Sequence, residues 1–149
     1  MRLDRPAVAL GLALLSACAS AALKPPSLRV EGLRVDKLGI TGAALDVKFR
    51  IQNPNPEPML IERFQYELIL NGHRMGRGYE ADPVELEGFR DARVVSRFDV
   101  NLLSLPGTIK AILDEDRARA RVEGTFYVRE GRRLKHVPFD VDAEVDLAR

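Results

Sequence analysis

The chain has 149 residues with 23 basic and 22 acidic side chains, and aromatic residues make up only 6% of it. This balance argues against nucleic acid as the main partner, because binding to phosphates requires a concentrated positive field. The length is typical of one domain, and with a single cysteine the core must hold without an internal disulfide.

The first seventeen residues have the three parts of a secretory signal peptide. Arg2 and Arg5 form a positive start, residues 7–15 are apolar, and the small residues Ser16 and Ala17 precede the cleavage point. The apolar run is only about half of the roughly 20 residues that a membrane-spanning helix needs. We therefore expect residues 1–17 to be removed, which leaves 132 of the 149 residues with 21 basic and 21 acidic side chains.

Cys18 lies where the apolar run ends. The tetrapeptide Leu15-Ser16-Ala17-Cys18 resembles the lipobox of bacterial lipoproteins, which implies cleavage between Ala17 and Cys18 and a diacylglycerol on the Cys18 thiol. Two or three acyl chains anchor a protein stably, whereas a single chain is marginal. The resemblance also implies the outer membrane, facing the periplasm, because no aspartate follows the cysteine. The alternative is an ordinary signal peptide, cut after Ala17, Ala19 or Ala21.

Residues 19–27 contain two prolines and no periodicity, so we expect residues 18–27 to be a lipidated N-terminus and tether. Fully extended, the tether reaches at most about 30 Å, enough to hold a domain just off a bilayer. The folded domain is expected over residues 28–149.

Alternation of apolar and charged residues dominates the domain. It is clearest in residues 45–51, where every second residue is apolar and those between are charged. The same period of two recurs in residues 28–40, with breaks at Gly32 and Gly39, and in residues 64–70, 94–102, 120–128 and 137–147. Such segments are strands with one face in a core and one in water. They predict an all-β chain that folds as an antiparallel β-sandwich.

Two hairpins can be aligned in detail. Asn71-Gly72 lies between two strands and favours a type I′ turn, because both residues tolerate positive φ. The pairs expected across this turn are Leu70 with His73, Leu68 with Met75, and Phe64 with Tyr79.

In the last hairpin, aligning the apolar faces predicts Phe126 opposite Phe139 and Val122 opposite Ala143. On the outer face Arg121 then meets Glu144 and Arg119 meets Asp146, as opposite charges across strands stabilise a sheet. A solvated, salt-bridged face is therefore favoured over an anion-binding patch. The basic residues near the turn have no such partner and form the one cluster suited to anionic lipid: Arg129, Arg132, Arg133 and Lys135.

One segment departs from the strand pattern. Residues 104–114 carry apolar side chains at positions 105, 109, 112 and 113, which is helical spacing. Ser104 is a suitable N-cap, and Pro106 is tolerated in a first helical turn. We expect a short helix that covers one end of the sandwich.

The motif Asn53-Pro54-Asn55-Pro56 follows the strand at residues 45–51. Each proline lacks an N–H donor and favours an extended residue before it, so the strand ends there, while asparagine side chains can bond to nearby backbone. We expect a structural role in preference to ligand binding.

The stretch from Val47 to Gly78 resembles the WHy (water stress and hypersensitive response) domain of the group 2 late-embryogenesis-abundant family. The resemblance rests on residues 49–56, on residues 66–72 with Asn71-Gly72, and on Gly76 and Gly78. It implies a seven-stranded sandwich of the fibronectin type III kind with one helix, in the form of a bacterial lipoprotein.

Catalytic and metal-binding patterns are lacking in the sequence. His73 and His136 are far apart and belong to no spaced ligand set, and the glycines at 72, 76 and 78 do not form a phosphate-binding loop. No serine lies in a nucleophile motif. We therefore predict a non-enzymatic monomer without metal or cofactor.

Two functions fit these features. The resemblance implies an envelope protein that protects other macromolecules during desiccation, cold or heat, and densely mixed surface charge is suited to this role. The alternative is an adaptor that recruits an envelope protein through a sheet edge or through the apolar end near the helix.

Overall fold

The computed structural model describes residues 22–104 and 107–148. The predicted leader, the cleavage point at Ala17, and Cys18 lie outside these residues, as does Pro106. In the described part, eight strands, a 3-10 turn and one helix follow one another: β1 (Ser27–Leu38), β2 (Gly42–Gln52), β3 (Met59–Leu70), β4 (His73–Glu80), β5 (Val84–Leu86), β6 (Asp91–Asn101), η1 (Leu102–Ser104), α1 (Thr108–Leu113), β7 (Arg117–Glu130) and β8 (Arg133–Ala148).

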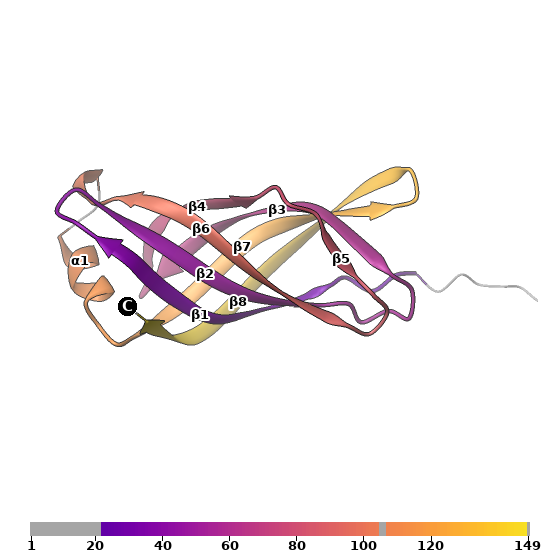
Figure 1. The fold of residues 1–149 in the computed structure, drawn as a ribbon, viewed down its shortest axis with the longest axis horizontal. Coiled ribbons are helices and arrows are strands. Elements are labelled where there is room, and N and C mark those ends of the chain that lie inside the picture. The colour runs from indigo at the N-terminus through magenta and orange to yellow at the C-terminus, as the bar shows by residue number, and fades with distance from the viewer. Residues whose placement is uncertain (1–21, 105–106, 149) are drawn as a thin grey trace, which may run out of the picture.

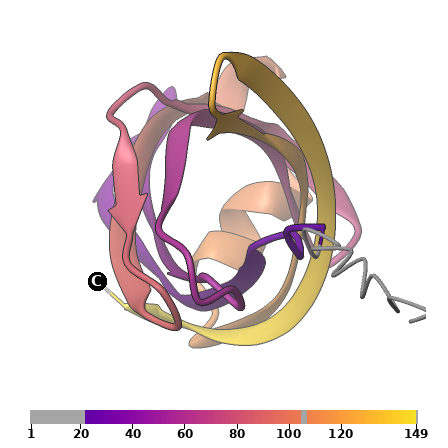
Figure 2. The ribbon, with the colours of Figure 1, turned by 90° about the vertical axis from the view of Figure 1, so that its right-hand side faces the viewer.

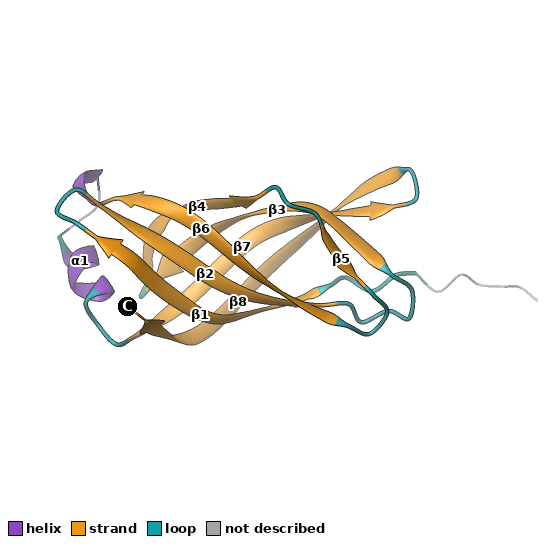
Figure 3. Ribbon diagram, viewed as in Figure 1, coloured by secondary structure: helices purple, strands orange, loops and turns teal. Residues whose placement is uncertain are grey.

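The strands form one sheet in the order β4-β3-β7-β8-β1-β2-β6, and β5 pairs with β3 beside β4. The sheet curls into a nearly closed barrel (Figure 1), and the end view in Figure 2 shows the ring of strands with α1 across its far end. Ile112 and Leu113 of α1 are buried against this end of the core. Figure 3 shows how little of the chain is helical.

The all-β prediction with one minor helix is confirmed, but the arrangement differs from a seven-stranded antiparallel sandwich. The structure has an eighth strand, β5, whose three residues are too few to show alternation. It also pairs β1 with β8 in parallel, at Leu33–Leu147 and Arg34–Ala148. This contact between the first and last strands joins β1, β2 and β6 to the other strands in one sheet. No local sequence pattern predicts so distant a pairing.

The interior is filled by the apolar face of the alternating segments. Leu45, Val47, Phe49 and Ile51 of β2 are all fully buried, as the period of two predicts. Aromatic rings meet edge to face inside the barrel. The centroids of Phe49 on β2 and Phe64 on β3, which are not neighbouring strands, are 5.6 Å apart, and those of Phe64 and Phe126 on the neighbouring strands β3 and β7 are also 5.6 Å apart. Each such pair adds about 0.5–1.5 kcal/mol to the effect of burial.

The β3–β4 hairpin confirms the predicted turn and corrects its register. Asn71 and Gly72 have φ values of 46° and 82°, and Leu70 pairs with His73. Beyond Arg74 a bulge shifts the pairing, so Leu68 lies opposite Gly76 and Phe64 opposite Glu80. Met75 is the extra residue, and the positive φ of 150° at Gly76 lets the chain accommodate it.

The β7–β8 hairpin has the predicted faces but a register displaced by two residues. Phe126 pairs with Val137 and Val122 with Val141, where Phe139 and Ala143 were expected. Arg121 lies opposite Asp142, and Arg119 opposite Glu144. A shift of two preserves which side chains point inward, so the alignment of apolar faces cannot detect it.

The predicted helix over residues 104–114 is shorter in the structure. Leu102–Ser104 form a 3-10 turn, and α1 begins only at Thr108. Ser104 thus lies four residues before the first residue of α1, which is too far for the predicted N-cap.

β1 bends at two bulges, which place Glu31 and Asp36 out of register with β2. The first lies beside Gly32, where the alternation in the sequence breaks. The second lies at Asp36 and not at Gly39, which instead donates its N–H to the Gly42 carbonyl in the turn to β2. Both bulged residues are acidic and pair with arginines, Glu31 with Arg50 of the neighbouring strand β2 and Asp36 with Arg97 of β6, one strand farther away.

The barrel has one seam without ladder hydrogen bonds, between the end strands β4 and β6. Their Cα atoms nevertheless approach within 8 Å. At the seam, a Cβ on Gly76 would lie 3.5 Å from the ring of Phe98. The edges of the sheet therefore face each other, with the Phe98 ring packed between them.

Candidate functional site at the tether-side end of the barrel

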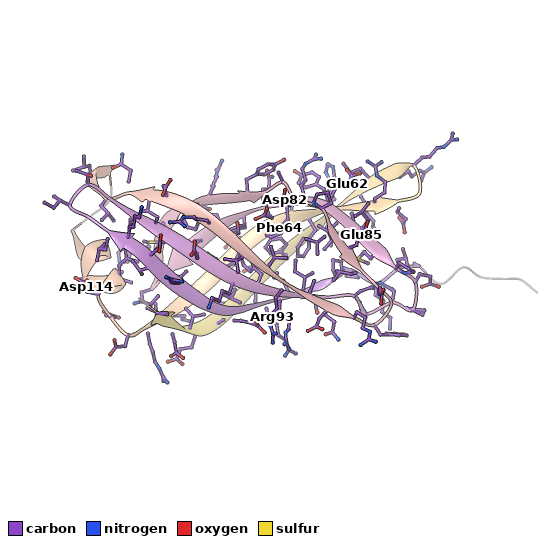
Figure 4. All side chains as sticks on the ribbon, in the orientation of Figure 1. Glu62, Phe64, Asp82, Glu85, Arg93 and Asp114 are labelled. Carbon is purple, nitrogen blue, oxygen red and sulfur yellow. The ribbon has the colours of Figure 1, made fainter. Side chains whose placement is uncertain are left out.

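The end of the barrel at which residues 22–26 lead into β1 is called here the tether-side end. It lies opposite the helix and includes the 53–57 loop, the 86–90 loop and the β7–β8 turn (Figure 1). Figure 4 places Glu62 and Glu85 toward this end and Asp114 at the helix end. Three of these segments meet through two asparagines of the proline-containing motif.

Asn53 is fully buried directly after β2 and bonds to two loops at once. Its Nδ2 donates to the carbonyl of Glu57 at 2.8 Å and to those of Leu86 and Glu87 at 3.2 Å each. Its Oδ1 accepts the backbone N–H of Asn55 at 2.9 Å. Asn53 thus gives hydrogen bonds to carbonyl groups of both loops, among them the buried carbonyl of Leu86, which reduces the cost of removing that group from water.

Asn55 fastens the segment that enters β1. Its Oδ1 accepts the backbone N–H of Lys24 at 2.7 Å, and its Nδ2 donates to the Lys24 carbonyl at 2.8 Å. The Asn55 carbonyl also accepts the N–H of Phe89 at 2.9 Å. One side chain therefore holds both backbone groups of Lys24, so this residue cannot move independently of the barrel.

The 86–90 loop fits closely over the motif. A Cβ at Gly88 would lie 1.9 Å from the carbonyl oxygen of Pro56, so only glycine allows this approach. The next residue, Phe89, has a φ of 57°, which is uncommon for a bulky residue. Phe89 nevertheless remains 66% exposed.

A mainly apolar hollow of about 190 Å³ lies beside the fastened segment. Pro25 and Pro26 form one side of it, and Met59, Val128 and Val137 line the barrel side. Lys135 and His136 of β8 are exposed at its border. The hollow thus combines an apolar interior with a polar rim that includes Lys24, Glu130 and Lys135.

The basic cluster at the β7–β8 turn is smaller than the sequence suggested. The Nε of Arg129 bonds to the Glu62 carboxylate at 2.6 Å, so Arg129 has an acidic partner. Glu62 belongs to β3, the neighbour of β7 on the side away from β8. Aligning β7 with β8 alone could therefore not predict this pair. Arg132, Arg133 and Lys135 are exposed and make no ion pair within 4.0 Å among residues 22–104 and 107–148.

The rest of the barrel surface carries interleaved ion pairs. Arg121 bonds to Asp140 at 2.6 Å, and Arg117 to Asp146 at 3.0 Å. The predicted contacts of Arg121 with Glu144 and of Arg119 with Asp146 are replaced by these diagonal and shifted partners. The hydrogen bond from Arg121 holds the pKa of Asp140 below its usual value, and desolvation opposes this effect.

Asn71 joins the β3–β4 turn to the start of β7. Its Oδ1 accepts the N–H of Arg119 at 2.8 Å, and its own N–H donates to the Arg119 carbonyl at 2.9 Å. Asn71 and Gly72 lie near the helix, far along the barrel from Asn53 and Pro56. The structure therefore separates the motif residues into two fastening points.

Two buried hydroxyls near the seam were not singled out in the sequence. Tyr66 on β3 and Ser96 on β6 both occupy inward positions, and neither hydroxyl has a partner with good hydrogen-bond geometry. Burial raises the pKa of Tyr66 to about 12, the Ser96 hydroxyl lowers it, and Glu80 adds to the rise. Each of them carries a hydroxyl at a position of its strand where the alternation requires an apolar residue. This mismatch could have identified both residues from the sequence.

Other residues of the site were invisible to sequence reasoning. Lys24 and Leu86 take part only through backbone groups, so their residue types carry no signal. His73 and His136 belong to no group of three or more potential metal ligands in the described ranges. In the same ranges, no helix is both long and apolar enough to span a bilayer.

Comparison with known proteins identifies a family. Residues 48–143 match the model of the family described as Late embryogenesis abundant protein, LEA_2, and this range covers more than half of the chain. The match confirms the family that residues 47–78 resemble, while the WHy domain and the lipoprotein form stay predictions. No curated protein matches the chain.

Three solved structures share the fold. A solution structure from Arabidopsis thaliana has a TM-score of 0.63 and 14% identity, with 86% of this chain and 85% of that chain covered. The solution structure of a putative late embryogenesis abundant protein has a TM-score of 0.52 and 17% identity, with coverage of 89% and 76%. A crystal structure from Archaeoglobus fulgidus has a TM-score of 0.50 and 16% identity, with coverage of 84% and 97%. At such identities the likeness concerns the fold alone.

Proposed function

The chain belongs to the late embryogenesis abundant family LEA_2, and from this premise we propose that it is a non-enzymatic lipoprotein of the cell envelope that protects other macromolecules under stress. The stresses in question are desiccation, cold and heat. The main support for this proposal is the surface of interleaved ion pairs on the barrel. The asparagines of the proline-containing motif, by contrast, are occupied in hydrogen bonds that stabilise the fold.

The surface charges support protection for a physical reason. Arg50 bridges Glu31 and Asp91 at 2.8 and 3.1 Å, and Arg93 reaches the same Glu31 at 3.1 Å. Exposed ion pairs contribute little to stability, so their value lies elsewhere. Densely mixed charge keeps a surface hydrated and resists association as water is withdrawn. Figure 4 shows Arg93 pointing away from the barrel into this outer layer.

The membrane anchor in this proposal is Cys18, with the outer membrane and its periplasmic face as the location. The fastened Lys24 supports it, because a tether can position a domain only if its far end is held. Globomycin should block processing, and mass spectrometry of the mature protein should find acylated Cys18 at the N-terminus. A Cys18→Ala chain that stays in the membrane fraction after processing would contradict the anchor.

The second candidate is an adaptor, and one observation favours it at the helix end. Ile40 is 86% exposed and Leu103 is 73% exposed. The two are neighbours in space, because the Leu102 N–H donates to the Thr41 carbonyl at 3.0 Å. A partner would bind here more readily than at a sheet edge, since β4 and β6 shield each other across the seam.

Freezing experiments separate the two functions. We expect the mature protein to preserve a freeze-sensitive enzyme better than an equal mass of an unrelated β-sandwich protein, and equal preservation would contradict protection. An Ile40→Ser, Leu103→Ser variant is the matched control. If it protects as well as the parent but loses a stoichiometric crosslinked partner in cells, the adaptor function is present as well.

A further inference from the structure

The tether-side end combines three features: the hydrogen-bonded segment at Lys24, basic side chains without ion pairs to any described residue, and exposed apolar groups. We propose that this end docks on the bilayer, with Arg132, Arg133 and Lys135 binding the phosphates of anionic lipid headgroups. The docking surface is formed by these three residues together with Phe89 and the hollow beside Pro25. This inference rests on the proposed anchor at Cys18 and adds an orientation and a lipid preference to it.

The length of chain between anchor and barrel brings this end to the membrane. Cys18 precedes Lys24 by six positions, so the thiol lies within about 20 Å of Lys24 even when the segment is fully extended. Both backbone groups of Lys24 are bonded to Asn55, at 2.7 and 2.8 Å, so Lys24 is a fixed part of the barrel. The distance from Cys18 to Lys24 is therefore the distance from the anchor to the barrel. An acylated Cys18 therefore keeps the tether-side end close to the headgroups.

Three neighbouring cations without ion pairs in the described ranges, Arg132, Arg133 and Lys135, lie at the same end. Farther along this hairpin, Arg117 and Arg121 have carboxylate partners at 3.0 and 2.6 Å, and Arg129 is bonded to Glu62. Past Arg129 the cations have no carboxylate within 4.0 Å in the described part of the chain, and the hairpin projects beyond the barrel on the tether side (Figure 1). Glu130 is the one acidic residue among them.

Apolar groups at this end suit the boundary between headgroups and acyl chains. Phe89 is 66% exposed, although its N–H is bonded to Asn55 and its backbone is in the left-handed region. Phenylalanine is among the residues that surface-bound segments bury at this depth of a bilayer. The hollow of about 190 Å³ between Pro25 and Val137 offers a second apolar surface, with Lys135 at its border. A protein partner would need neither the short tether nor the unpaired cations, which is why lipid is the occupant that we propose.

The test uses residues 18–149 with Cys18→Ser, which contain every described strand and no acyl group. Binding is measured by cosedimentation with vesicles of phosphatidylcholine, with and without phosphatidylglycerol, at low salt. We expect binding only with phosphatidylglycerol, and a loss of about fivefold for each cation replaced by glutamine. The triple variant Arg132→Gln, Arg133→Gln, Lys135→Gln should thus bind on the order of a hundredfold more weakly. Phe89→Asn, which keeps a residue tolerant of positive φ, should bind more weakly than the parent chain.

The matched control replaces three exposed cations elsewhere on the barrel, Lys37, Lys48 and Arg77, with glutamine. It has the same net charge as the triple variant, so equal losses in the two would show nonspecific attraction and overturn the proposal. Equal binding to both vesicle types would also overturn it. Circular dichroism confirms that each variant is folded.

The anchor and the docking surface can fail separately. Mass spectrometry of the mature protein from cells reports acylation of Cys18 and does not depend on the three cations. If Cys18 is unmodified while the unacylated chain still binds anionic vesicles through Arg132, Arg133 and Lys135, the anchor fails and the docking surface stands. If Cys18 is acylated but the triple variant binds like the parent, the docking surface is contradicted and the anchor stands.

Discussion

Tyr66 shows how a single inward side chain on a strand reports on its surroundings. Its ring fills the space beside Phe49, with 5.0 Å between centroids, and lies directly over Gly78, where a Cβ would come within 2.1 Å of it. The hydroxyl is carried into the core with the ring. Its ionised form is therefore disfavoured in the folded protein.

This burial predicts a stability that falls at alkaline pH. The pKa of Tyr66 is raised from 10.0 to about 12 on folding. Between these values the unfolded chain releases a proton that the folded chain keeps, so the free energy of unfolding should drop by about 1.4 kcal/mol per pH unit above pH 10. Absorbance at 295 nm should show one tyrosine that ionises late, and Tyr66→Phe should abolish both effects. Tyr79→Phe is the control, because Tyr79 is 58% exposed.

At the scale of elements, the 53–57 loop does more than end a strand. Asn53 and Asn55 replace the ladder that prolines interrupt, and they connect this loop to the 86–90 loop and to the start of β1. The prolines were sufficient to predict the end of β2. The partners of the asparagines were not predictable, because they are backbone groups about 30 residues away.

Replacing Asn53 with alanine tests the importance of this loop. The change removes the Asn53 donor from the buried carbonyl of Leu86 and from the part-buried carbonyl of Glu57, while the Glu87 carbonyl keeps the N–H of Arg90. We expect the free energy of unfolding in urea to fall by about 2–3 kcal/mol, as unsatisfied buried groups usually require. Gln52→Ala, at the exposed neighbouring position, should change it by less than about 0.5 kcal/mol. Equal effects of the two substitutions would show that the loop is not held through Asn53.

The two hairpins show why faces are easier to predict than registers. In β7–β8 the apolar face was predicted correctly, but Phe126 pairs with Val137, two residues from Phe139. In β3–β4 the turn was correct, and the bulge at Met75 then displaced every pair beyond it. Side-chain alternation has a period of two, so it cannot detect a shift of two, and a bulge of one residue leaves no clear mark.

At the scale of the whole molecule, the seam between β4 and β6 decides whether the barrel stays closed. It has side-chain packing in place of ladder hydrogen bonds, with 6.1 Å between the centroids of Tyr66 and Phe98. Because no ladder joins β4 to β6, the contact between these two strands depends on the Phe98 ring, whereas paired strands are held by their ladders. The seam also explains why a sheet edge is a poor site for a partner.

Phe98→Ala should therefore loosen the barrel locally. We expect a loss of about 2–4 kcal/mol in the free energy of unfolding, since a partly buried ring leaves a cavity behind. Hydrogen exchange should speed up in β4 and β6 while β7 and β8 keep their protection. Val95→Ala on the same strand is the control, because Val95 is 56% exposed. Uniform acceleration over all strands would contradict a separate role for the seam.

The sequence by itself determined the all-β class, the Asn71-Gly72 turn, the buried faces and the family resemblance over residues 47–78. These features arise from near neighbours, since alternation and turn residues act over a few positions. Only the tertiary structure decided the single curled sheet, the parallel contact of β1 with β8, and the partners of Asn53 and Asn55. Each of these features joins segments that are far apart in the chain. Many of the contacts use backbone groups, which every residue has, so residue types could not predict them.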